Sequence, residues 1–285
     1  MKYLEYLNAC NSGNTEDFIP FYIAQHHVGF IRPEFSQLLF KHSDIFRLTS
    51  KGIKLDDDIQ GFQQRTDAFT LLIKQFIDAK IITHYYNEPY PVICKTHPQP
   101  LCCIDRFSAS YFGIRGYGQH LNGVVQTANG LEMWIAKRAK ERVLFPEQLD
   151  NMVAGGLPYG KTAQQNLIKE CAEEAGMSEI LSLQAKAVSL ITYNAATVKG
   201  FRPDVIYCYD ILLDDSFTPV CTDDEVECFY RWPIEKVIEI VQNTDDFKLN
   251  CNLVIIDFLI RWGYIEPQDA NYVEISNRLR TPLAV

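Results

Sequence analysis

Three glutamates stand close together in the segment from Thr162 to Gly176, which reads TAQQNLIKECAEEAG. At about 100° per residue, Glu170, Glu173 and Glu174 fall together on one face of a helix, opposite an apolar face. Like charges at these spacings repel each other by a few tenths of a kcal/mol per pair. Mg²⁺ and Mn²⁺ prefer oxygen ligands, so clustered carboxylates suit them. The pattern therefore predicts either a metal site or a solvated acidic face.

Both ends of this helix are marked in the sequence. Thr162 followed by Gln165 has the form of a capping box, and Gly176 suits the left-handed position after the last turn. These signals predict a helix that holds the three glutamates in one register.

The residues just upstream favour the metal site. From Gly155 the chain reads GGLPYGKTAQQNLIKECAEEAGM, which resembles the Nudix box. That motif runs Gly, five residues, Glu, seven residues, then Arg-Glu-U-X-Glu-Glu-X-Gly-U, where U is aliphatic. The matching positions begin at Gly155, which is followed by Gly156, and they end with Lys169, the three glutamates and Gly176.

Two positions depart from the Nudix pattern. Lys161 stands where a Glu is expected, which removes one carboxylate. Lys169 replaces the Arg, so the charge is kept but the bidentate geometry is lost. Both departures weaken the resemblance to generic Nudix enzymes.

A phosphate-binding loop is a rival interpretation of the same residues. Gly155, Gly160, Lys161 and Thr162 satisfy the pattern GxxxxGK[ST]. Such a loop needs a buried strand before it and a parallel sheet of βα units. The short run 152–154 is a poor strand, and the surrounding strands are expected as hairpins. We therefore rank this interpretation below the Nudix box.

Further stretches resemble one Nudix subfamily, related to thiamine pyrophosphokinase, which carries an extra amino-terminal domain of the DUF4743 type. Residues 28–35, VGFIRPEF, are similar to a segment of that extra domain. Members often lack the upstream Glu and have Lys before the first acidic residue, as here. The other similar stretches are 111–123, 149–156, 202–210, 223–230 and 251–265.

The resemblance implies a fold and an activity. The fold is α/β: a Nudix α/β/α sandwich with a mixed sheet, preceded by a smaller α/β domain. The activity is Mg²⁺- or Mn²⁺-dependent hydrolysis of a small-molecule diphosphate. For this subfamily the substrate is thiamine diphosphate or its oxidised analogues, cleaved to the monophosphate and phosphate. The alternative, motivated by Lys161, is a Nudix-fold module that binds a nucleotide or thiamine derivative without hydrolysis.

The resemblance also implies roles for the acidic residues. Glu170 and Glu174 are expected as the principal metal ligands, with Glu173 sharing the metal shell or assisting proton transfer. Many Nudix enzymes supply a further carboxylate from a loop beyond the box, and Glu225 in the DDEVE segment is our choice. An acidic turn before a strand explains the DDEVE segment equally well.

Substrate contacts are less marked in the sequence. Arg202 is expected either to hold a phosphate or to pair with Asp204, and Arg115 is a second candidate for a phosphate. Tyr193 would stack on a thiazolium or pyrimidine ring, because a cation over an aromatic face is stabilised. Aromatic residues at strand spacing are otherwise part of a core.

The chain around these residues divides into three expected parts. Residues 1–105 are predicted as the accessory α/β domain, 106–265 as the Nudix domain and 266–285 as a carboxyl-terminal tail. Four prolines between Asn87 and Pro100 exclude a continuous helix or central strand and favour a domain edge.

Strands and helices are expected in the second part. Strands at 120–127 and 131–137 flank Asn129-Gly130, which predicts a hairpin with a type I′ turn. Later strands are expected at 187–193, 205–213 and 225–232, followed by helices at 234–241 and 251–262.

Composition excludes several classes of protein. The 285 residues include 27 Lys and Arg against 36 Asp and Glu, and the net charge of −9 disfavours nucleic acid as a partner. No apolar run is long enough for a membrane span, and Glu5 interrupts what would be a signal-peptide core, so we expect a cytoplasmic protein. Nine cysteines without a CxxC pair indicate reduced thiols. The oligomeric state is left open.

Overall fold

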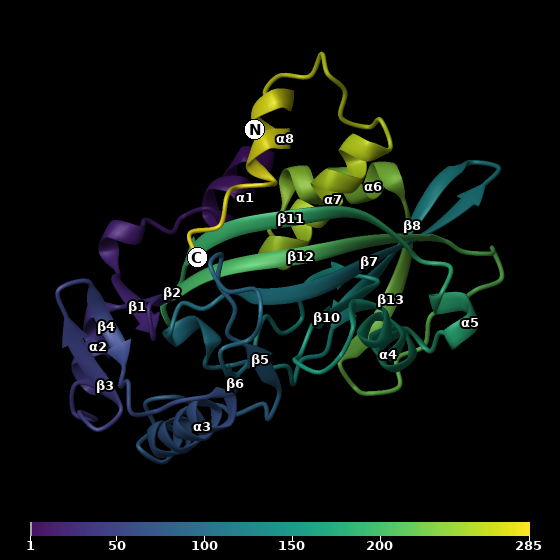
Figure 1. The fold of residues 1–285 in the computed structure, drawn as a ribbon. Coiled ribbons are helices and arrows are strands. Elements are labelled where there is room, and N and C mark those ends of the chain that lie inside the picture. Colours follow the sequence, from purple (N-terminus) through teal and green to yellow (C-terminus); the bar gives the residue numbers. More distant parts are fainter. Residues whose placement is uncertain (1) are drawn as a thin grey trace.

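A mixed seven-stranded sheet forms the centre of the computed structural model, which describes residues 2–285 (Figure 1). Five strands follow in the order β11-β12-β7-β8-β13, while β10 pairs with β7 and β9 pairs with β8. β7 and β12 run parallel, and the other pairs are antiparallel. The strands are β7 (Gly116–Thr127), β8 (Gly130–Arg138), β9 (Leu149–Asn151), β10 (Val153–Gly156), β11 (Lys186–Ala196), β12 (Phe201–Leu212) and β13 (Val226–Pro233).

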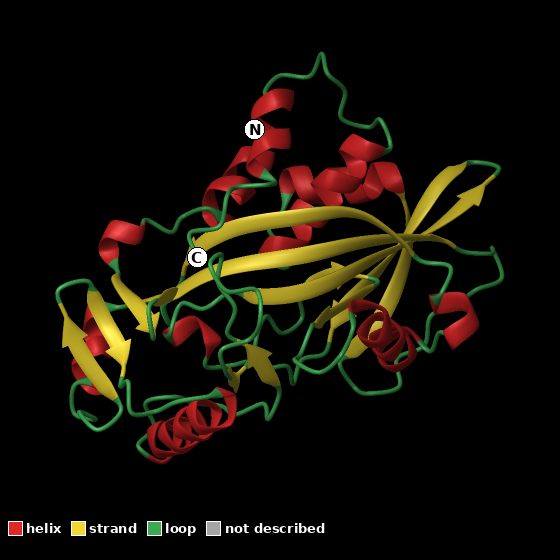
Figure 2. Ribbon diagram, viewed as in Figure 1, coloured by secondary structure: helices red, strands yellow, loops and turns green. Residues whose placement is uncertain are grey.

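Helices cover both faces of this sheet, as Figure 2 shows. On one face, apolar side chains of four helices share a core with the strands. These helices are α1 (Lys2–Cys10), α6 (Ile234–Asn243), α7 (Leu249–Arg261) and α8 (Tyr272–Arg278). On the other face lie α4 (Ala163–Ala175) and the short α5 (Glu179–Ser182), and α4 buries Leu167, Cys171 and Ala175 against the sheet. The α/β/α sandwich with a mixed sheet, expected from the sequence, is confirmed.

A smaller α/β unit precedes the large sheet. Its four strands are ordered β2-β1-β4-β3, and a second hydrophobic core with members from Phe21 to Ile114 stabilises it. Two helices and a short strand pair complete the unit. The elements are β1 (Ile19–Ile23), β2 (His26–Ile31), α2 (Pro33–Leu39), β3 (Phe46–Thr49), β4 (Gly52–Leu55), α3 (Phe62–Asp78), β5 (Pro89–Pro91) and β6 (Cys103–Asp105), with single 3₁₀ turns at Thr15–Asp17 and Ala109–Tyr111.

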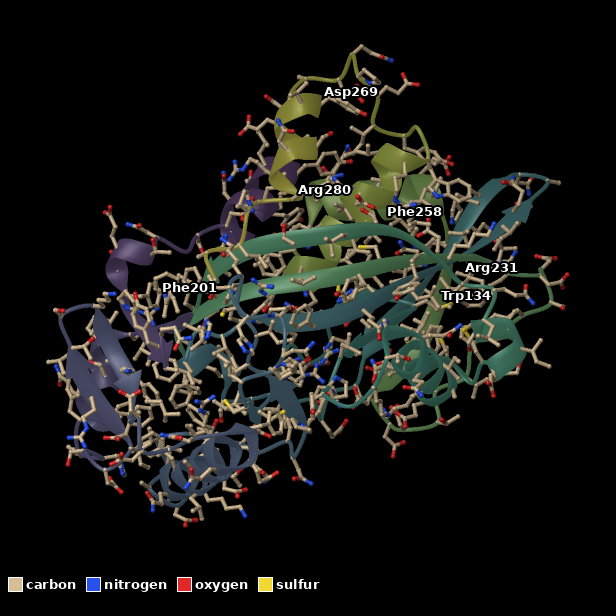
Figure 3. All side chains as sticks on the ribbon, in the orientation of Figure 1. Trp134, Phe201, Arg231, Phe258, Asp269 and Arg280 are labelled. Atoms are coloured by element: carbon tan, nitrogen blue, oxygen red, sulfur yellow. The ribbon has the colours of Figure 1, made fainter. Side chains whose placement is uncertain are left out.

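The hydrophobic cores divide the chain differently from the expected limits at 105 and 265. α1 packs with α7 and β11 in the large core, although it lies at the start of the chain. The carboxyl-terminal segment also packs there, since Ile275 and Leu279 are buried. Phe201, labelled in Figure 3, joins Phe18, Phe30 and Val285 where the two units meet. Packing thus ties both ends of the chain to the large sheet.

The predicted hairpin is present, but its turn differs from the prediction. Thr127 pairs with Gly130, so the two turn residues are Ala128 and Asn129. Gly130 has a φ of 123°, whereas Asn129 does not have a positive φ. A type I′ turn at Asn129-Gly130 is therefore wrong, because both of its central residues require positive φ.

The expectation of reduced thiols agrees with the structure of residues 2–285. All nine cysteines are free thiols, and seven of them are buried. No helix in this part of the chain is long and apolar enough to cross a membrane.

Candidate active site

The helix that carries the three glutamates is α4, and both predicted caps are confirmed. The Thr162 hydroxyl accepts from the Gln165 N–H at 3.2 Å, and the Gln165 side chain accepts from the Thr162 N–H at 3.0 Å. Gly176 ends the helix in the left-handed conformation, with φ 63°. Asn166 then fastens the helix to β10, because its Nδ2 donates to the Gly156 carbonyl at 2.8 Å.

Glu170 and Glu174 both lie against β10. The Glu174 Oε2 accepts from the Ala154 N–H at 2.7 Å, and only 5% of the residue is exposed. A Cβ on Gly155 would lie 2.6 Å from Cγ of Glu170, so the absence of a side chain at Gly155 makes room for this glutamate. The structure therefore brings the first glycine of the motif and two of its carboxylates together.

Electrostatics at this point favour a bound cation. Burial above all, together with the negative charges of Glu170, Asp150 and Glu225, raises the pKa of Glu174 to about 8, although the hydrogen bond from the Ala154 N–H opposes the shift. Burial also raises the pKa of Glu170. Glu174 forms no ion pair among residues 2–285, and a buried carboxylate without a counter-charge is costly, so a divalent cation would remove that cost. The oxygen donors at β10 fit a hard metal such as Mg²⁺ or Mn²⁺.

Glu173 occupies a more open position on the same helix. Its side chain is 40% exposed and forms an ion pair with Lys169. Lys169 also lies 3.3 Å from the Glu170 carboxylate, so one lysine bridges two of the three acids. Although partial burial opposes it, hydrogen bonding to Glu173 raises the pKa of Lys169. Lys169 thus stabilises the acidic helix face in this structure.

Glu225 lies just before β13, close enough to Glu174 for its charge to act on that carboxyl. Its negative charge contributes to the raised pKa of Glu174, although the two residues are far apart in the sequence. The carboxylate of Glu225 forms a 2.5 Å ion pair with Arg142. Because this pair is partly exposed, it is expected to be weak. Glu225 therefore stays our candidate for the further carboxylate ligand from a loop beyond the Nudix box.

The alternative of a phosphate-binding loop does not fit the fold. β10 runs antiparallel to β7, whereas a phosphate-binding loop follows a strand of a parallel sheet. Lys161 is exposed, and Thr162 serves as the helix cap.

Two of the proposed substrate residues form a closed network on the opposite face of the sheet. Arg202 lies 2.5 Å from the Asp204 carboxylate, and the Tyr193 hydroxyl donates to the same carboxylate at 2.8 Å. Tyr193 is only 3% exposed. Arg202 thus pairs with Asp204, which is one of the two alternatives expected from the sequence. Tyr193 takes part in the same network as a structural residue.

Arg115 contacts the end of the chain. Its guanidinium donates to the Tyr117 hydroxyl at 3.2 Å and to the carbonyl of Val285. These contacts give Arg115 a role in fastening the carboxyl terminus beside β7. No contact of Arg115 with the acidic residues of α4 is present among residues 2–285.

The small unit brings residues to the site that the sequence analysis missed. The Tyr90 hydroxyl and the Arg106 guanidinium lie directly at Gly156, where a Cβ would be 2.6 Å from Cζ of Arg106. Tyr90 belongs to the proline-rich segment interpreted as a domain edge, and Arg106 follows β6. Nothing in the local sequence pattern indicates that these two residues contact Gly156, which is far from them in the sequence. The glycine doublet at 155–156 is the one signal of a close approach.

A buried polar cluster lies where β7, β9 and α7 meet. His120, Asp150 and Cys251 place possible ligand atoms within 4.8 Å of one another. However, the Asp150 carboxylate already pairs with Arg138 at 3.0 Å and with Lys248 at 2.5 Å. Two positive charges at this carboxylate disfavour a metal ion, so we interpret the cluster as structural.

His120 predicts a loss of stability in mild acid. Burial and the charge of Lys248 lower its pKa from 6.5 to about 4. The unfolded chain therefore binds the proton first as the pH falls from 6.5 to 4, and the free energy of unfolding should drop by up to about 3 kcal/mol.

Urea denaturation at pH 7 and pH 4.5 measures this effect. His120→Asn keeps a donor near Asn151, whose Oδ1 lies 2.7 Å from the histidine Nδ1. The variant should show a flatter dependence on pH than the wild type. An equal slope in both proteins would assign the acid sensitivity to other groups.

The fold and the site together define a class of protein: an α/β/α sandwich in which one helix presents carboxylates beside a glycine strand. Residues 2–116 match a family described as "Domain of unknown function (DUF4743)". The chain is 38% identical over 290 residues to Nudix hydrolase 20, chloroplastic, of Arabidopsis thaliana, covering 98% of this chain and 77% of that protein. It is also 38% identical to Nudix hydrolase 24, chloroplastic, of the same plant, with the same coverage.

A solved structure is similar over about half of the chain. The NUDIX domain of Shewanella oneidensis NrtR, complexed with ADP-ribose, has 13% identity and a TM-score of 0.43, covering 53% of this chain and 90% of that chain. From the two plant relatives, the chain belongs to the Nudix hydrolase family, and the expectation of an enzyme of that class is confirmed. Both plant relatives are named as chloroplastic, so the cytoplasmic location stays a prediction.

Proposed function

We propose that this chain is a metal-dependent hydrolase that cleaves thiamine diphosphate, or its oxidised analogues, to the monophosphate and phosphate. The observation that carries the reaction type is the pair of poorly exposed carboxylates, Glu170 and Glu174, held against β10. The choice of substrate is supported by the stretches that resemble the thiamine pyrophosphokinase-related subfamily.

The residues of α4 supply the binding and the orientation. Glu170 and Glu174 would hold Mg²⁺ or Mn²⁺, with Glu225 nearby as a third carboxylate. When bound, such an ion neutralises charge on the diphosphate and lowers the pKa of a water molecule. Glu174 is pre-oriented, because the Ala154 N–H fixes its carboxylate. Glu173 either completes the ligands or accepts a proton.

The proposed reaction consumes one water molecule. The water oxygen forms a new bond to one phosphorus, and the bridging P–O bond breaks. The leaving phosphate oxygen keeps the electron pair of that bond, and one proton is released from the water. Two cationic side chains, Lys169 beside Glu170 and Arg142 beside Glu225, would offset the negative charge of the products.

A second candidate is a module that binds the same compounds without hydrolysis. Two observations favour it: Lys161 stands where the motif has Glu, and Lys169 pairs with both Glu170 and Glu173. This candidate predicts binding by calorimetry without product.

A substrate panel tests the proposal. Thiamine diphosphate, its oxy analogue, ADP-ribose and ATP are incubated with the protein and Mg²⁺ or Mn²⁺, and the products are separated by chromatography. We expect turnover on the thiamine compounds and none with chelator present. Turnover on ADP-ribose or ATP alone would keep the reaction type and reject the substrate, while binding without product would favour the second candidate.

A further inference from the structure

We infer that Arg106, a residue of the small unit, binds a phosphate of the substrate at the α4 site. The inference rests on the proposed function and gives the small unit a part in substrate binding. It is carried by the contacts between the small unit and the glycine strand β10.

The small unit contacts two segments next to β10: the loop that follows this strand and the neighbouring strand β7. The Tyr159 N–H donates to the Pro89 carbonyl at 2.8 Å, and the rings of Tyr159 and Phe62 lie 5.2 Å apart. The Tyr90 hydroxyl donates to the Tyr117 carbonyl of β7 at 3.1 Å. These contacts fix the segment around Arg106 relative to the acidic helix.

Gly156 allows Arg106 to approach the strand. A Cβ at this position would overlap the Tyr90 hydroxyl and lie 2.6 Å from Cζ of Arg106. The preceding residue, Gly155, makes the same kind of close contact with Glu170. Because successive residues of a strand face opposite sides, Glu170 and Arg106 contact the same short stretch of β10 from its two sides.

The guanidinium of Arg106 is oriented but retains free donors. Its Nη1 lies 2.8 Å from Glu88 Oε2, and its Cζ lies 5.7 Å from the centre of the Tyr90 ring. Among residues 2–285, neither Nε nor Nη2 of Arg106 has a hydrogen-bond acceptor, and 37% of the side chain is exposed. A fixed, solvent-accessible guanidinium whose Nε and Nη2 are both free to donate suits a phosphate group.

The charges around Arg106 are consistent with this role. Burial alone would lower its pKa, but Tyr90, Glu88 and, at longer range, Glu170 raise it overall. Arg106 therefore stays cationic beside the acidic site. Glu170 and Glu174 would hold a metal ion on one side of β10, and Arg106 would add a positive charge on the other. A diphosphate that reaches both would be bound more tightly and in one orientation.

The experiment compares four variants with the wild type. Arg106→Gln removes the guanidinium charge, and Arg106→Lys keeps the charge without the fork of donors. Glu88→Gln breaks the ion pair but leaves Arg106 in place. Arg47→Gln is the matched control, because Arg47 belongs to the same unit and pairs with Asp56. Melting temperatures show which variants keep the fold.

Two readouts are measured: KM for thiamine diphosphate with Mg²⁺, and the Kd of inorganic pyrophosphate with Mg²⁺ by calorimetry. We expect Arg106→Gln to raise both by roughly tenfold or more, since a hydrogen bond between charged groups is lost. Arg106→Lys and Glu88→Gln should fall between this variant and the wild type, and Arg47→Gln should match the wild type.

Two results would overturn the inference. One is an unchanged KM and an unchanged pyrophosphate Kd in folded Arg106→Gln. The other is an equal effect of Glu88→Gln and Arg106→Gln, which would mean that Arg106 acts only through its ion pair. If the wild type cleaves none of the panel, the proposed function fails, and the pyrophosphate titration still decides the role of Arg106.

Discussion

Glu174→Gln is expected to lower the turnover number by about 10³-fold or more and to leave the fold intact. The substitution keeps the shape of the side chain and an oxygen that can accept from the Ala154 N–H. It removes the negative charge at the point where a metal ligand is proposed. A loss of about 4 kcal/mol of transition-state stabilisation corresponds to this factor.

The stability of the same variant separates a functional role from a structural one. Burial raises the pKa of Glu174 to about 8, so its negative charge is disfavoured in the metal-free fold. A neutral glutamine avoids this cost, and the melting temperature without metal should be equal to or higher than that of the wild type. Added Mg²⁺ should stabilise the wild type and not the variant, because a ligand stabilises only the state that binds it.

Glu179→Gln is the matched control for this experiment. Glu179 lies on the neighbouring helix α5 and is exposed. The same chemical change there should leave both turnover and the effect of Mg²⁺ unaltered. Turnover of Glu174→Gln at the rate of the wild type would show that the buried carboxylate is not part of the site.

The acidic helix was predictable from sequence because its signals are local. Thr162, Gln165 and Gly176 determine the two caps, and the spacing of Glu170 and Glu174 places them on one side of a 3.6-residue helix. All of these interactions are made within one helix or at its ends. The α/β/α sandwich with a mixed sheet was expected from the family resemblance and not from spacing, and the order of its strands was not predicted.

Contacts between distant segments were not predictable in the same way. Arg106 and Gly156 are separated by 50 positions, and no periodicity connects them. α1 is amphipathic, but an apolar stripe does not specify which surface will cover it, and it packs on α7 instead of on the small unit. Tyr193 is an aromatic residue that could stack on a ring, yet at its position on β11 the side chain points into the core.

Asp150→Asn is expected to lower the free energy of unfolding by about 3–5 kcal/mol, the cost of breaking a buried ion pair from one side. Asp150 is 3% exposed, and its carboxylate contacts Arg138 and Lys248. It also accepts from the Cys251 thiol at 2.6 Å. An asparagine would leave two cations without their counter-charge. Urea denaturation at pH 7 measures the loss.

The dependence on pH identifies the charge of Asp150 as the cause. Burial alone would raise its pKa, but Lys248, His120 and Arg138 lower it to about 2. The stabilisation by the ionised group is therefore complete above pH 3.8 and is lost as the pH falls from 3.8 through about 2. The difference between wild type and variant should be smaller at pH 3 than at pH 7. Asp58→Asn, a change on an exposed turn, serves as the control and should shift stability by less than about 0.5 kcal/mol.

A double substitution tests whether the unpaired cation accounts for the loss. Lys248→Met in the Asp150→Asn background removes one of the two stranded charges and keeps most of the side-chain volume. The double variant should be more stable than Asp150→Asn alone, because neighbouring charges couple and their effects do not add. If the second substitution lowers stability by the same amount in both backgrounds, Lys248 and Asp150 do not interact, and the stability of the cluster comes from its packing.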